Sequence, residues 1–208
     1  MPIAHPGPAY RIVTKRTLLR CWQPADAPLL KAAIDENIEH LRPWMPWISG
    51  EPTDLQAKVD LMRYFRGRFD LNQDYVYGIF LPDESRVLGG TGMHTRLGPA
   101  ALEIGSWIHK DYINQGIATE ISAALTKAAF EVHQVYRVEI HCDTDNMASA
   151  AVPRKLGFTH DATLRRQSLH NNELRDSMIW VLHDIDYPNT PSAQAEAAMF
   201  DALDRQIL

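Results

Sequence analysis

Apolar and polar residues follow two different periods along this chain. Short apolar runs, typical of β-strands, alternate with longer stretches in which an apolar residue returns every third or fourth position, the period of an amphipathic helix. The strand-like runs span residues 12–20, 75–81, 87–94, 102–109, 135–142, 163–169 and 173–182, with a turn at Asn171-Asn172 between the last two. The helix-like stretches span residues 24–41, 53–69, 117–132 and 146–156. This order predicts one mixed α/β sheet with helices on both faces.

Two prolines interrupt the pattern of the first helix. Pro43 and Pro46 lie close together, and each removes a backbone donor and fixes its own φ, so the segment 41–47 is not predicted as a regular helix. Trp44 and Trp47 lie on this stiffened loop. They either cap the hydrophobic core or bind substrate as one wall of a pocket.

The length of 208 residues fits one large domain. We expect a flexible, Pro-rich leader at residues 1–9, a domain at residues 10–187 and a tail at residues 188–208. Within the tail, residues 193–207 have a helical pattern, so the tail is predicted to be helical.

Charge and composition exclude several classes of protein. The formal net charge of −5 argues against a nucleic-acid partner, since such binders usually carry a basic excess. No apolar run approaches the roughly 20 residues that span a bilayer, and the first residues do not resemble a secretory signal, so no membrane partner is expected. Cys21 and Cys142 are interpreted as two buried free thiols of a cytoplasmic protein. The histidines show no metal-ligand spacing, so no metal site is predicted.

The stretch 102–119 carries the strongest chemical signal. An apolar strand ends in a polar turn, passes through Gly116 and becomes a long amphipathic helix. Backbone N–H groups at a helix start have no acceptor within the helix, and together with the helix dipole they bind phosphate anions. We expect the amides of residues 114–119 to cradle a phosphate, with Gly116 and Ala118 small enough for close approach. An ordinary tight turn between a strand and a helix is the alternative.

Four motifs in order carry a resemblance to a known family. They are Glu103-Ile-Gly-Ser-Trp-Ile-His109, Gln115-Gly-Ile-Ala-Thr119, Asp145-Asn-Met-Ala-Ser149 and Lys155-Leu-Gly-Phe158. On these motifs the chain resembles, over roughly residues 10–187, the GNAT superfamily of acyl-CoA-dependent N-acyltransferases. Within it, the chain is similar to the RimJ/RimL branch, which acetylates the N-termini of ribosomal proteins. The loop at 41–47 is similar to a region that this branch carries near its acceptor site.

The resemblance implies a fold and a cofactor. The fold is a mostly antiparallel, seven-stranded sheet with one splayed parallel pair, and the cofactor is acetyl-CoA. The strand at 102–109 would pair its free N–H groups with the pantetheine like an added strand, and one of them would polarise the thioester oxygen. The residues implied to bind the cofactor are Trp107, Ile108, His109, Asn114, Gln115, Gly116, Ile117, Ala118, Thr119, Asn146 and Ser149. Dimerisation is common in this branch, which makes a homodimer one candidate assembly.

Glu103 is the first candidate for the catalytic base. It is a carboxylate in an otherwise apolar strand, where burial favours proton uptake, and several superfamily members place a base on this strand. Alternatively, Glu103 is solvated or paired with an Arg, and the base is His94, His109 or water alone. By resemblance, Ser149 is the catalytic hydrogen-bond donor to the leaving sulfur. Asn146 and Ser149 share one helix face, and pure N-capping by Asn146 is the alternative there.

Three positions depart from the family pattern. Ile113 stands where the phosphate turn usually opens with Gln or Arg. Pro153 lies inside the short helix and is expected to kink it. Ser168 stands where some relatives carry a Glu, which argues against transferring a base from those relatives.

The activity implied by the resemblance is acetyl transfer to a primary amine. The acceptor is expected to be a peptide N-terminus or an amino-acid-like molecule. A detoxifying acetyltransferase of an antibiotic or aminoacyl nucleotide, and a non-catalytic acyl-CoA-binding module, are the alternatives. The sequence fixes neither the acceptor nor the length of the acyl group, because these depend on the acceptor pocket.

Overall fold

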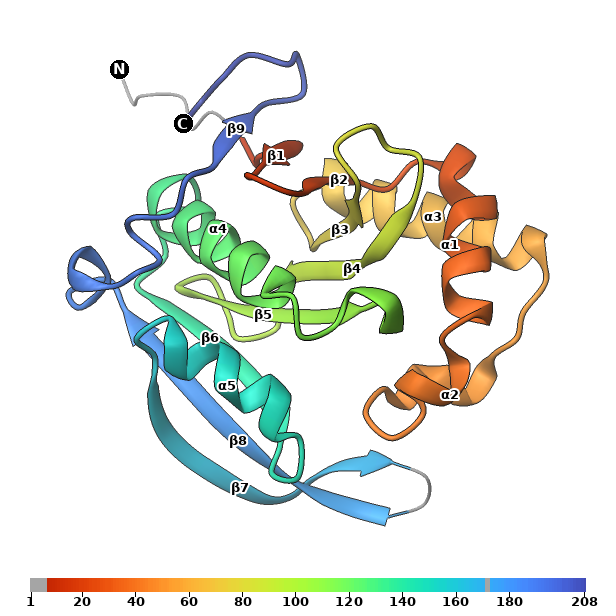
Figure 1. The fold of residues 1–208 in the computed structure, drawn as a ribbon. Coiled ribbons are helices and arrows are strands. Elements are labelled where there is room, and N and C mark those ends of the chain that lie inside the picture. The colour runs from red at the N-terminus through yellow and green to blue at the C-terminus, as the bar shows by residue number, and fades with distance from the viewer. Residues whose placement is uncertain (1–6, 171–172) are drawn as a thin grey trace.

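The computed structural model describes residues 7–170 and 173–208. The described strands form one nine-stranded sheet in the order β7-β8-β6-β5-β4-β3-β2-β1-β9 (Figure 1). All neighbouring strands are antiparallel except β5 and β6, which are parallel. The strands are β1 (Arg11–Val13), β2 (Leu18–Cys21), β3 (Tyr75–Phe80), β4 (Val87–His94), β5 (Ala101–Ile108), β6 (Arg137–Asp143), β7 (Thr159–His170), β8 (Glu173–His183) and β9 (Ala198–Phe200).

Helices pack against both faces of this sheet. Alternate residues of a strand point to opposite faces. Leu19 and Ile79 accordingly belong to the hydrophobic cluster that includes residues of α4 and α5, which lie side by side in Figure 1, whereas Leu18 and Phe80 belong to the cluster of α1 and the middle of α3. The helices are α1 (Ala27–Asp35), α2 (Ile38–Leu41), α3 (Leu55–Asp70), α4 (Ile117–Glu131) and α5 (Met147–Lys155). Short 3-10 turns are η1 (Pro24–Asp26), η2 (Pro46–Gly50), η3 (Lys110–Tyr112) and η4 (Tyr187–Asn189).

β5 and β6 pair over only half of their length. Their parallel register runs from Ala101 opposite Arg137 to Ile104 opposite Ile140, and it stops there. Beyond that point, residues 105–108 pair only with β4, and residues 141–143 pair only with β8. The two strands therefore diverge into a gap, where backbone groups on the facing edges lack a strand partner. The expected mixed sheet with a splayed parallel pair is confirmed.

The sheet has nine strands instead of the expected seven, for two reasons. The apolar run at 12–20 folds back on itself as the hairpin β1–β2 instead of forming one strand. The tail adds β9, which pairs with β1, so the predicted helix at 193–207 is wrong. Met199 of β9 is completely buried, and the backbone of β9 pairs with that of β1. This burial and pairing favour a strand over the helix that the local period predicts.

Only part of the predicted leader lies within the described residues. Most of the predicted flexible leader, residues 1–6, lies outside the described residues, as does the turn Asn171-Asn172. The remaining part of the leader is packed: Ala9 is completely buried, and its carbonyl accepts a hydrogen bond of 2.9 Å from the Tyr77 hydroxyl. Residues 8 and 9 are thus packed against the fold, and the flexibility of the leader stays a prediction.

The first helical pattern is divided at Asn37, where α1 gives way to α2. As predicted, the proline-containing segment 41–47 is not a regular helix, because α2 ends at Leu41 and only η2 follows before α3. At the other expected irregularity, Pro153 lies inside α5, which ends two residues later at Lys155.

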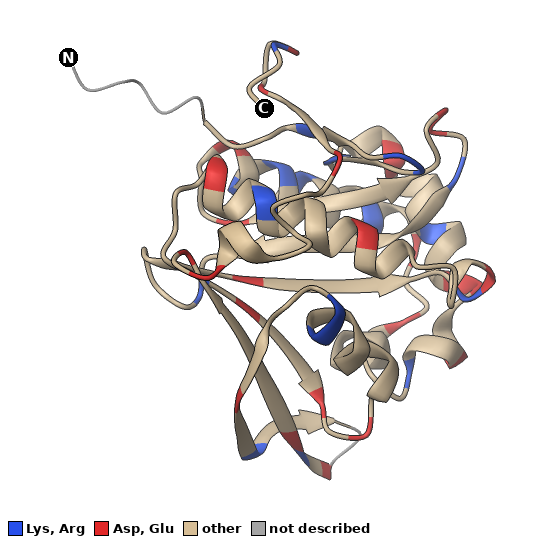
Figure 2. Cartoon of the chain, turned by 60° about the vertical axis from the view of Figure 1, so that its left-hand side comes forward, with Lys and Arg blue, Asp and Glu red and all other residues tan. Residues whose placement is uncertain are grey.

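Acidic and basic residues are interspersed over the helices and strands in Figure 2 and do not form one basic face in that view. Among the described residues, no helix is long and apolar enough to cross a membrane. Cys21 and Cys142 are both buried and free, as expected.

Candidate active site

The turn between β5 and α4 is shaped for close approach of a ligand. Asn114 and Gly116 have left-handed backbone conformations, with φ of 59° and 80°, and Gly116 is the N-cap of α4. A β-carbon at Gly116 would be strained at this φ. Residues 114–116 are exposed, and the first amides of α4 have no acceptor within the helix. The turn therefore presents an open helix N-terminus, which suits a phosphate.

The gap between β5 and β6 begins beside this turn. Trp107 and Ile108 are half-buried at the end of β5. On the other side of the gap, β6 leads into α5, where the Asn146 side chain caps the helix by accepting the Ser149 N–H at 3.0 Å. Ser149 itself is half-buried. The capping role of Asn146 is thus observed, and it leaves the Ser149 hydroxyl for other contacts.

Glu103 lies on β5, just before the gap. It is 5 % exposed, and both of its carboxylate oxygens bond to the Arg96 guanidinium, with Arg96 Nε at 2.6 Å from Oε2. Pairing with an arginine was one of the alternatives for this residue. Because Arg96 donates a hydrogen bond to each carboxylate oxygen, neither oxygen of Glu103 is free to accept a proton from a substrate. Glu103 is better suited to stabilise a nearby positive charge.

His141 is the first residue of β6 beyond the parallel ladder, and the sequence reasoning missed it. Its Nε2 lies 2.6 Å from Oε2 of Glu139, and its Nδ1 lies 3.7 Å from Oε2 of Glu103. Both carboxylates are buried, whereas the His141 side chain is 23 % exposed. An imidazole between two buried carboxylates, at the point where two strands part, is a candidate for proton transfer.

The family follows from the sequence match together with this geometry. Residues 16–159 match the family described as "Acetyltransferase (GNAT) domain". The chain belongs to the GNAT acetyltransferase family. It is therefore an acetyl-CoA-dependent acetyltransferase, and the predicted fold, enzyme class and cofactor are confirmed.

Similar proteins cover most of the chain. The "Putative ribosomal N-acetyltransferase YdaF" of Bacillus subtilis (strain 168) is 28% identical over 171 residues, which are 81% of this chain and 91% of that protein. A crystal structure titled "Probable acetyltransferase" has a TM-score of 0.77 at 26% identity and covers 83% of this chain and 96% of its own. The acetyltransferase MccE in complex with acetyl-CoA and AMP has the same fold, with a TM-score of 0.76 at 18% identity over 82% of this chain and 93% of its own.

In this GNAT chain, the residues predicted to bind the cofactor lie around one opening. Those of β5 and the turn lie along one side of the gap, and those of α5 lie at its other side. The first group is Trp107, Ile108, Asn114, Gln115, Gly116, Ile117, Ala118 and Thr119, and the second is Asn146 and Ser149. Acetyl-CoA fits this arrangement, because the open helix N-terminus suits its phosphates and the unpaired edge of β5 suits its pantetheine amides.

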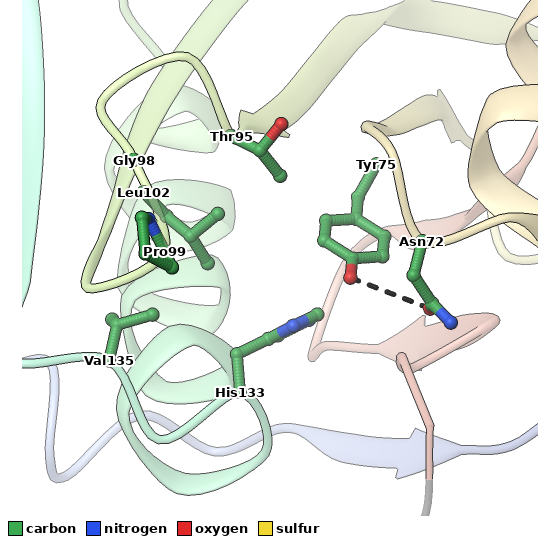
Figure 3. Close-up of a pocket in the computed structure, with 8 residues that line it drawn as sticks. All are labelled: Asn72, Tyr75, Thr95, Gly98, Pro99, Leu102, His133 and Val135. Carbon is green, nitrogen blue, oxygen red and sulfur yellow. Dashed lines mark hydrogen bonds between the residues drawn. The ribbon is translucent and has the colours of Figure 1, made fainter.

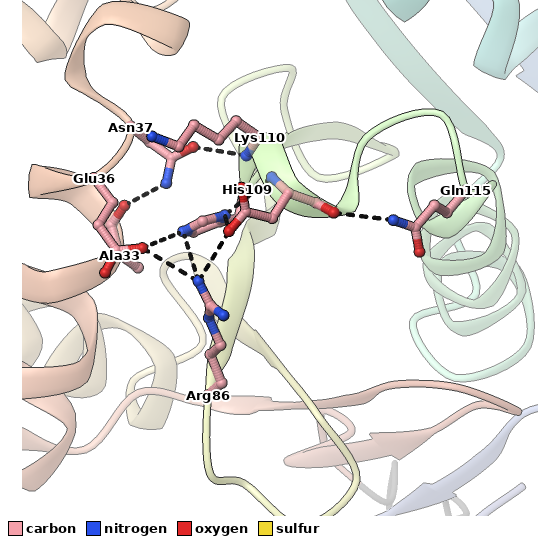
Figure 4. Close-up of polar contacts among 8 residues, drawn as sticks. Ala33, Glu36, Asn37, Arg86, His109, Lys110 and Gln115 are labelled. Carbon is pink, nitrogen blue, oxygen red and sulfur yellow. Dashed lines mark hydrogen bonds and ion pairs between the residues drawn. The ribbon is translucent and has the colours of Figure 1, made fainter.

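His109 differs from the other predicted cofactor residues, because its ring is completely buried. Its Nδ1 accepts the Asp111 backbone N–H at 3.2 Å, and its Nε2 lies 3.0 Å from Oε2 of Glu36 (Figure 4). Arg86 binds the carboxylates of both Glu36 and Asp111, each at 3.2 Å. The His109 ring therefore joins the end of α1 to the end of β5, and its backbone N–H donates to the Leu88 carbonyl oxygen of β4 at 2.8 Å.

Glu36, His109 and Asp111 also place three potential metal-ligand atoms within 4.8 Å of one another. The Arg86 guanidinium already pairs with both carboxylates of this group. A metal ion would gain most of its binding energy from these two carboxylates, and the positive charge of Arg86 already neutralises them. The group therefore does not suit a metal.

His94, the other histidine considered as a base, is held by Asp74, with Nδ1 and Oδ1 3.0 Å apart. Its ring lies close to Gly92 and Gly105, where a β-carbon would come within 3.0 and 3.7 Å of it. His94 is thus engaged on the surface of the sheet, one strand away from the gap.

Trp47 lies beside the cofactor strand. Its ring centre is 6.2 Å from that of Trp107, and its side chain is 43 % exposed. The β7–β8 hairpin reaches the same region, because His170 Nε2 lies 2.5 Å from the Arg42 carbonyl oxygen. Trp44 is half-buried on the same loop. Of the two tryptophans predicted to bind substrate, Trp47 is the one that lies against β5.

A cavity of about 440 Å³ lies at the opposite end of β5 (Figure 3). Its lining includes Tyr75, Thr95, Leu102 and His133. Because the phosphate turn follows the other end of β5, this cavity is separate from the candidate active site.

Proposed function

We propose that the acceptor is the primary amine of a peptide N-terminus or of an amino-acid-like molecule. The observation that carries this proposal is the partly exposed His141 ring between Glu103 and Glu139, where β5 and β6 part. An α-amine reacts only when it has lost its extra proton, and a base next to buried carboxylates attracts the ammonium form and removes that proton. The similarity to YdaF, whose name refers to ribosomal N-acetylation, supports the same acceptor class.

In the proposed reaction, residues on both sides of the gap either accept a proton or donate a hydrogen bond. Bound acetyl-CoA supplies the acetyl thioester. His141 Nδ1 takes the proton released as the acceptor nitrogen bonds to the carbonyl carbon, and the Glu103 carboxylate stabilises the resulting imidazolium. Glu139 holds the ring through Nε2–H. The Ser149 hydroxyl would donate a hydrogen bond to the sulfur of the bound thioester, and a free amide of β5 would hold its carbonyl oxygen.

A second acceptor class has one observation in its favour. Trp47 and Trp107 form an aromatic pair beside the cofactor strand, and such a surface stacks on a planar base. The structure of MccE, which contains AMP, has the same fold. An aminoacyl nucleotide is therefore the alternative acceptor, and detoxification the alternative role.

A thiol-release assay with acetyl-CoA separates these acceptors. The panel contains Ser- and Ala-initiated peptides, the same peptides with an acetylated N-terminus, free amino acids, aminoglycosides and a non-hydrolysable aminoacyl adenylate. Turnover on the free peptides but not on their acetylated forms supports an N-terminal acceptor. Turnover on the adenylate alone supports the alternative, and thiol release with aminoglycosides alone contradicts both.

We also propose a cytoplasmic location and a homodimer. The two buried free thiols fit a reducing compartment. The β7–β8 hairpin exposes Leu164, Leu169 and Leu174, and apolar side chains of this kind suit a contact between two copies. Light scattering after size exclusion tests the dimer: the mass of one chain, 23.6 kDa, would contradict it.

A further inference from the structure

Arg16 contacts the cofactor turn from a distant part of the chain. It lies in the turn of the β1–β2 hairpin, and its Nη1 donates to the Gln115 carbonyl oxygen at 2.7 Å. None of the four motifs includes this residue. The bond fixes the orientation of the peptide group between Gln115 and Gly116, because a held carbonyl oxygen also keeps the N–H of the same peptide in place.

Glu120 explains why a cation is needed there. It lies in the first turn of α4, where its Oε2 accepts from Arg16 Nε at 2.6 Å. Its Oε1 accepts from the Arg16 backbone N–H at 3.0 Å and from the Thr14 hydroxyl at 2.7 Å. A carboxylate at a helix N-terminus stabilises the helix, but it also opposes an anion that binds there. The ion pair with Arg16 removes this opposition.

The Arg16 guanidinium also lies beside Gly116, the N-cap of α4. Its Nη2 makes neither of these bonds, and it lies 3.5 Å from the position that a β-carbon on Gly116 would take. The side chain is 44% exposed. A positive group next to an exposed helix N-terminus strengthens the attraction for phosphate.

We propose that Arg16 is a recognition residue for the phosphate groups of coenzyme A. It holds the Gln115 carbonyl, neutralises Glu120 and presents Nη2 to the anion at the N-terminus of α4. This inference rests on the GNAT cofactor and does not depend on the acceptor. The first step of recognition therefore involves the β1–β2 hairpin, a part of the fold outside the motif that binds the pyrophosphate.

The test compares two ligands that differ in their phosphates. Coenzyme A carries them, whereas S-acetylpantetheine has the thioester arm and no phosphate. We expect Arg16→Gln to weaken coenzyme A binding about tenfold in calorimetry and to leave the binding of S-acetylpantetheine unchanged. The loss should shrink as salt is raised, because salt screens the charge contribution.

Two further variants make the test specific. Arg11→Gln also removes a positive charge from the β1–β2 hairpin, but Arg11 forms its ion pair with Asp204. This variant should therefore leave coenzyme A affinity unchanged. Adding Glu120→Gln to Arg16→Gln removes the uncompensated carboxylate and should restore part of the coenzyme A affinity. If Arg16→Gln alone unfolds, this double variant replaces it in the comparison of the two ligands.

Wild-type affinity for coenzyme A in Arg16→Gln would overturn the proposal. An equal loss for both ligands would overturn it too, since it would indicate a structural role only. The measurements contain no acceptor, so they succeed or fail independently of the acceptor proposed above.

Discussion

At the scale of single residues, His141 and Glu103 divide one task between them. Arg96 binds both oxygens of Glu103, whereas the Nδ1 of His141 faces Glu103 at 3.7 Å without a hydrogen bond. A group whose lone pair is not engaged accepts a proton more readily than one that two donors already hold. We therefore assign the proposed proton transfer to His141 and the proposed charge stabilisation to Glu103.

We predict that His141→Gln lowers kcat about 100-fold, the typical contribution of a general base, and leaves coenzyme A affinity unchanged. Initial rates at saturating acetyl-CoA and calorimetry with coenzyme A measure the two quantities. His160→Gln is the matched control, since His160 is exposed on β7. A variant that keeps its full rate would show that water or Glu103 removes the proton.

Cys142 gives a second prediction at this scale. Burial raises the pKa of its thiol from 9.0 to about 11. Above pH 9 the unfolded chain loses this proton while the folded protein retains it, so the free energy of unfolding should fall as the pH rises through that interval. Urea unfolding at about pH 8 and at about pH 10.5 measures this, and the decrease should be smaller in Cys142→Ala. An identical pH dependence in the variant would contradict the prediction.

At the scale of elements, the junction between α1 and α2 fixes the loop at 41–47, which is proposed to bind substrate, to the segment that follows β5. Asn37 is completely buried; its Oδ1 accepts the Lys110 N–H at 2.7 Å, and its Nδ2 donates to the Ala33 carbonyl at 2.7 Å (Figure 4). Because Lys110 begins η3, two residues after the end of β5, the Asn37 side chain sets the position of α2 and the loop that follows it relative to the gap.

We predict that Asn37→Ala lowers the free energy of unfolding by about 1–3 kcal/mol, because it leaves a buried N–H and a buried carbonyl without partners. Chemical denaturation measures this loss. Glu39→Ala, which removes an exposed ion pair with Arg42 in the adjacent helix, should produce no measurable change. Equal effects of the two substitutions would show that the buried bonds do not hold the junction.

The same elements show what a sequence reveals about this fold. The strands and long helices follow from local apolar periods, and the phosphate turn follows from Gly116 and its flanking pattern. The break at Asn37 and strand β9 do not, because each depends on a partner far away in the chain. His141 was missed for the same reason: nothing local reveals that it lies across the gap from Glu103, since that depends on the register of two strands. The hairpin β1–β2 is a local pairing, and the polar residues 14–17 between its strands are the turn that the prediction of a single strand overlooked.

At the scale of the whole molecule, the sheet consists of two parts joined by a short parallel ladder. Strands β9, β1, β2, β3, β4 and β5 form one part, and β6, β8 and β7 form the other. Only four residue pairs of β5 and β6 connect them, from Ala101–Arg137 to Ile104–Ile140. A cofactor that adds its amides to the free edge of β5 while its phosphates hold α4 would extend this connection across the gap.

We therefore predict that coenzyme A slows amide hydrogen exchange on both sides of the gap, in residues 105–108, at the start of α4 and at the start of α5. A ligand present at 100 times its Kd stabilises the folded state by about 2.7 kcal/mol, so the midpoint of thermal unfolding should also rise. Strand β9 provides the internal control, because it lies at the edge of the sheet, with β4, β3, β2 and β1 between it and β5, and should exchange at the same rate with and without the ligand. Protection confined to the start of α4 would mean that the phosphates bind there while the gap stays open. The two parts of the sheet would then be held together by the β5–β6 ladder and the packing of α4 and α5, without a contribution from the cofactor, and the acetyl group would have to reach His141 by another route.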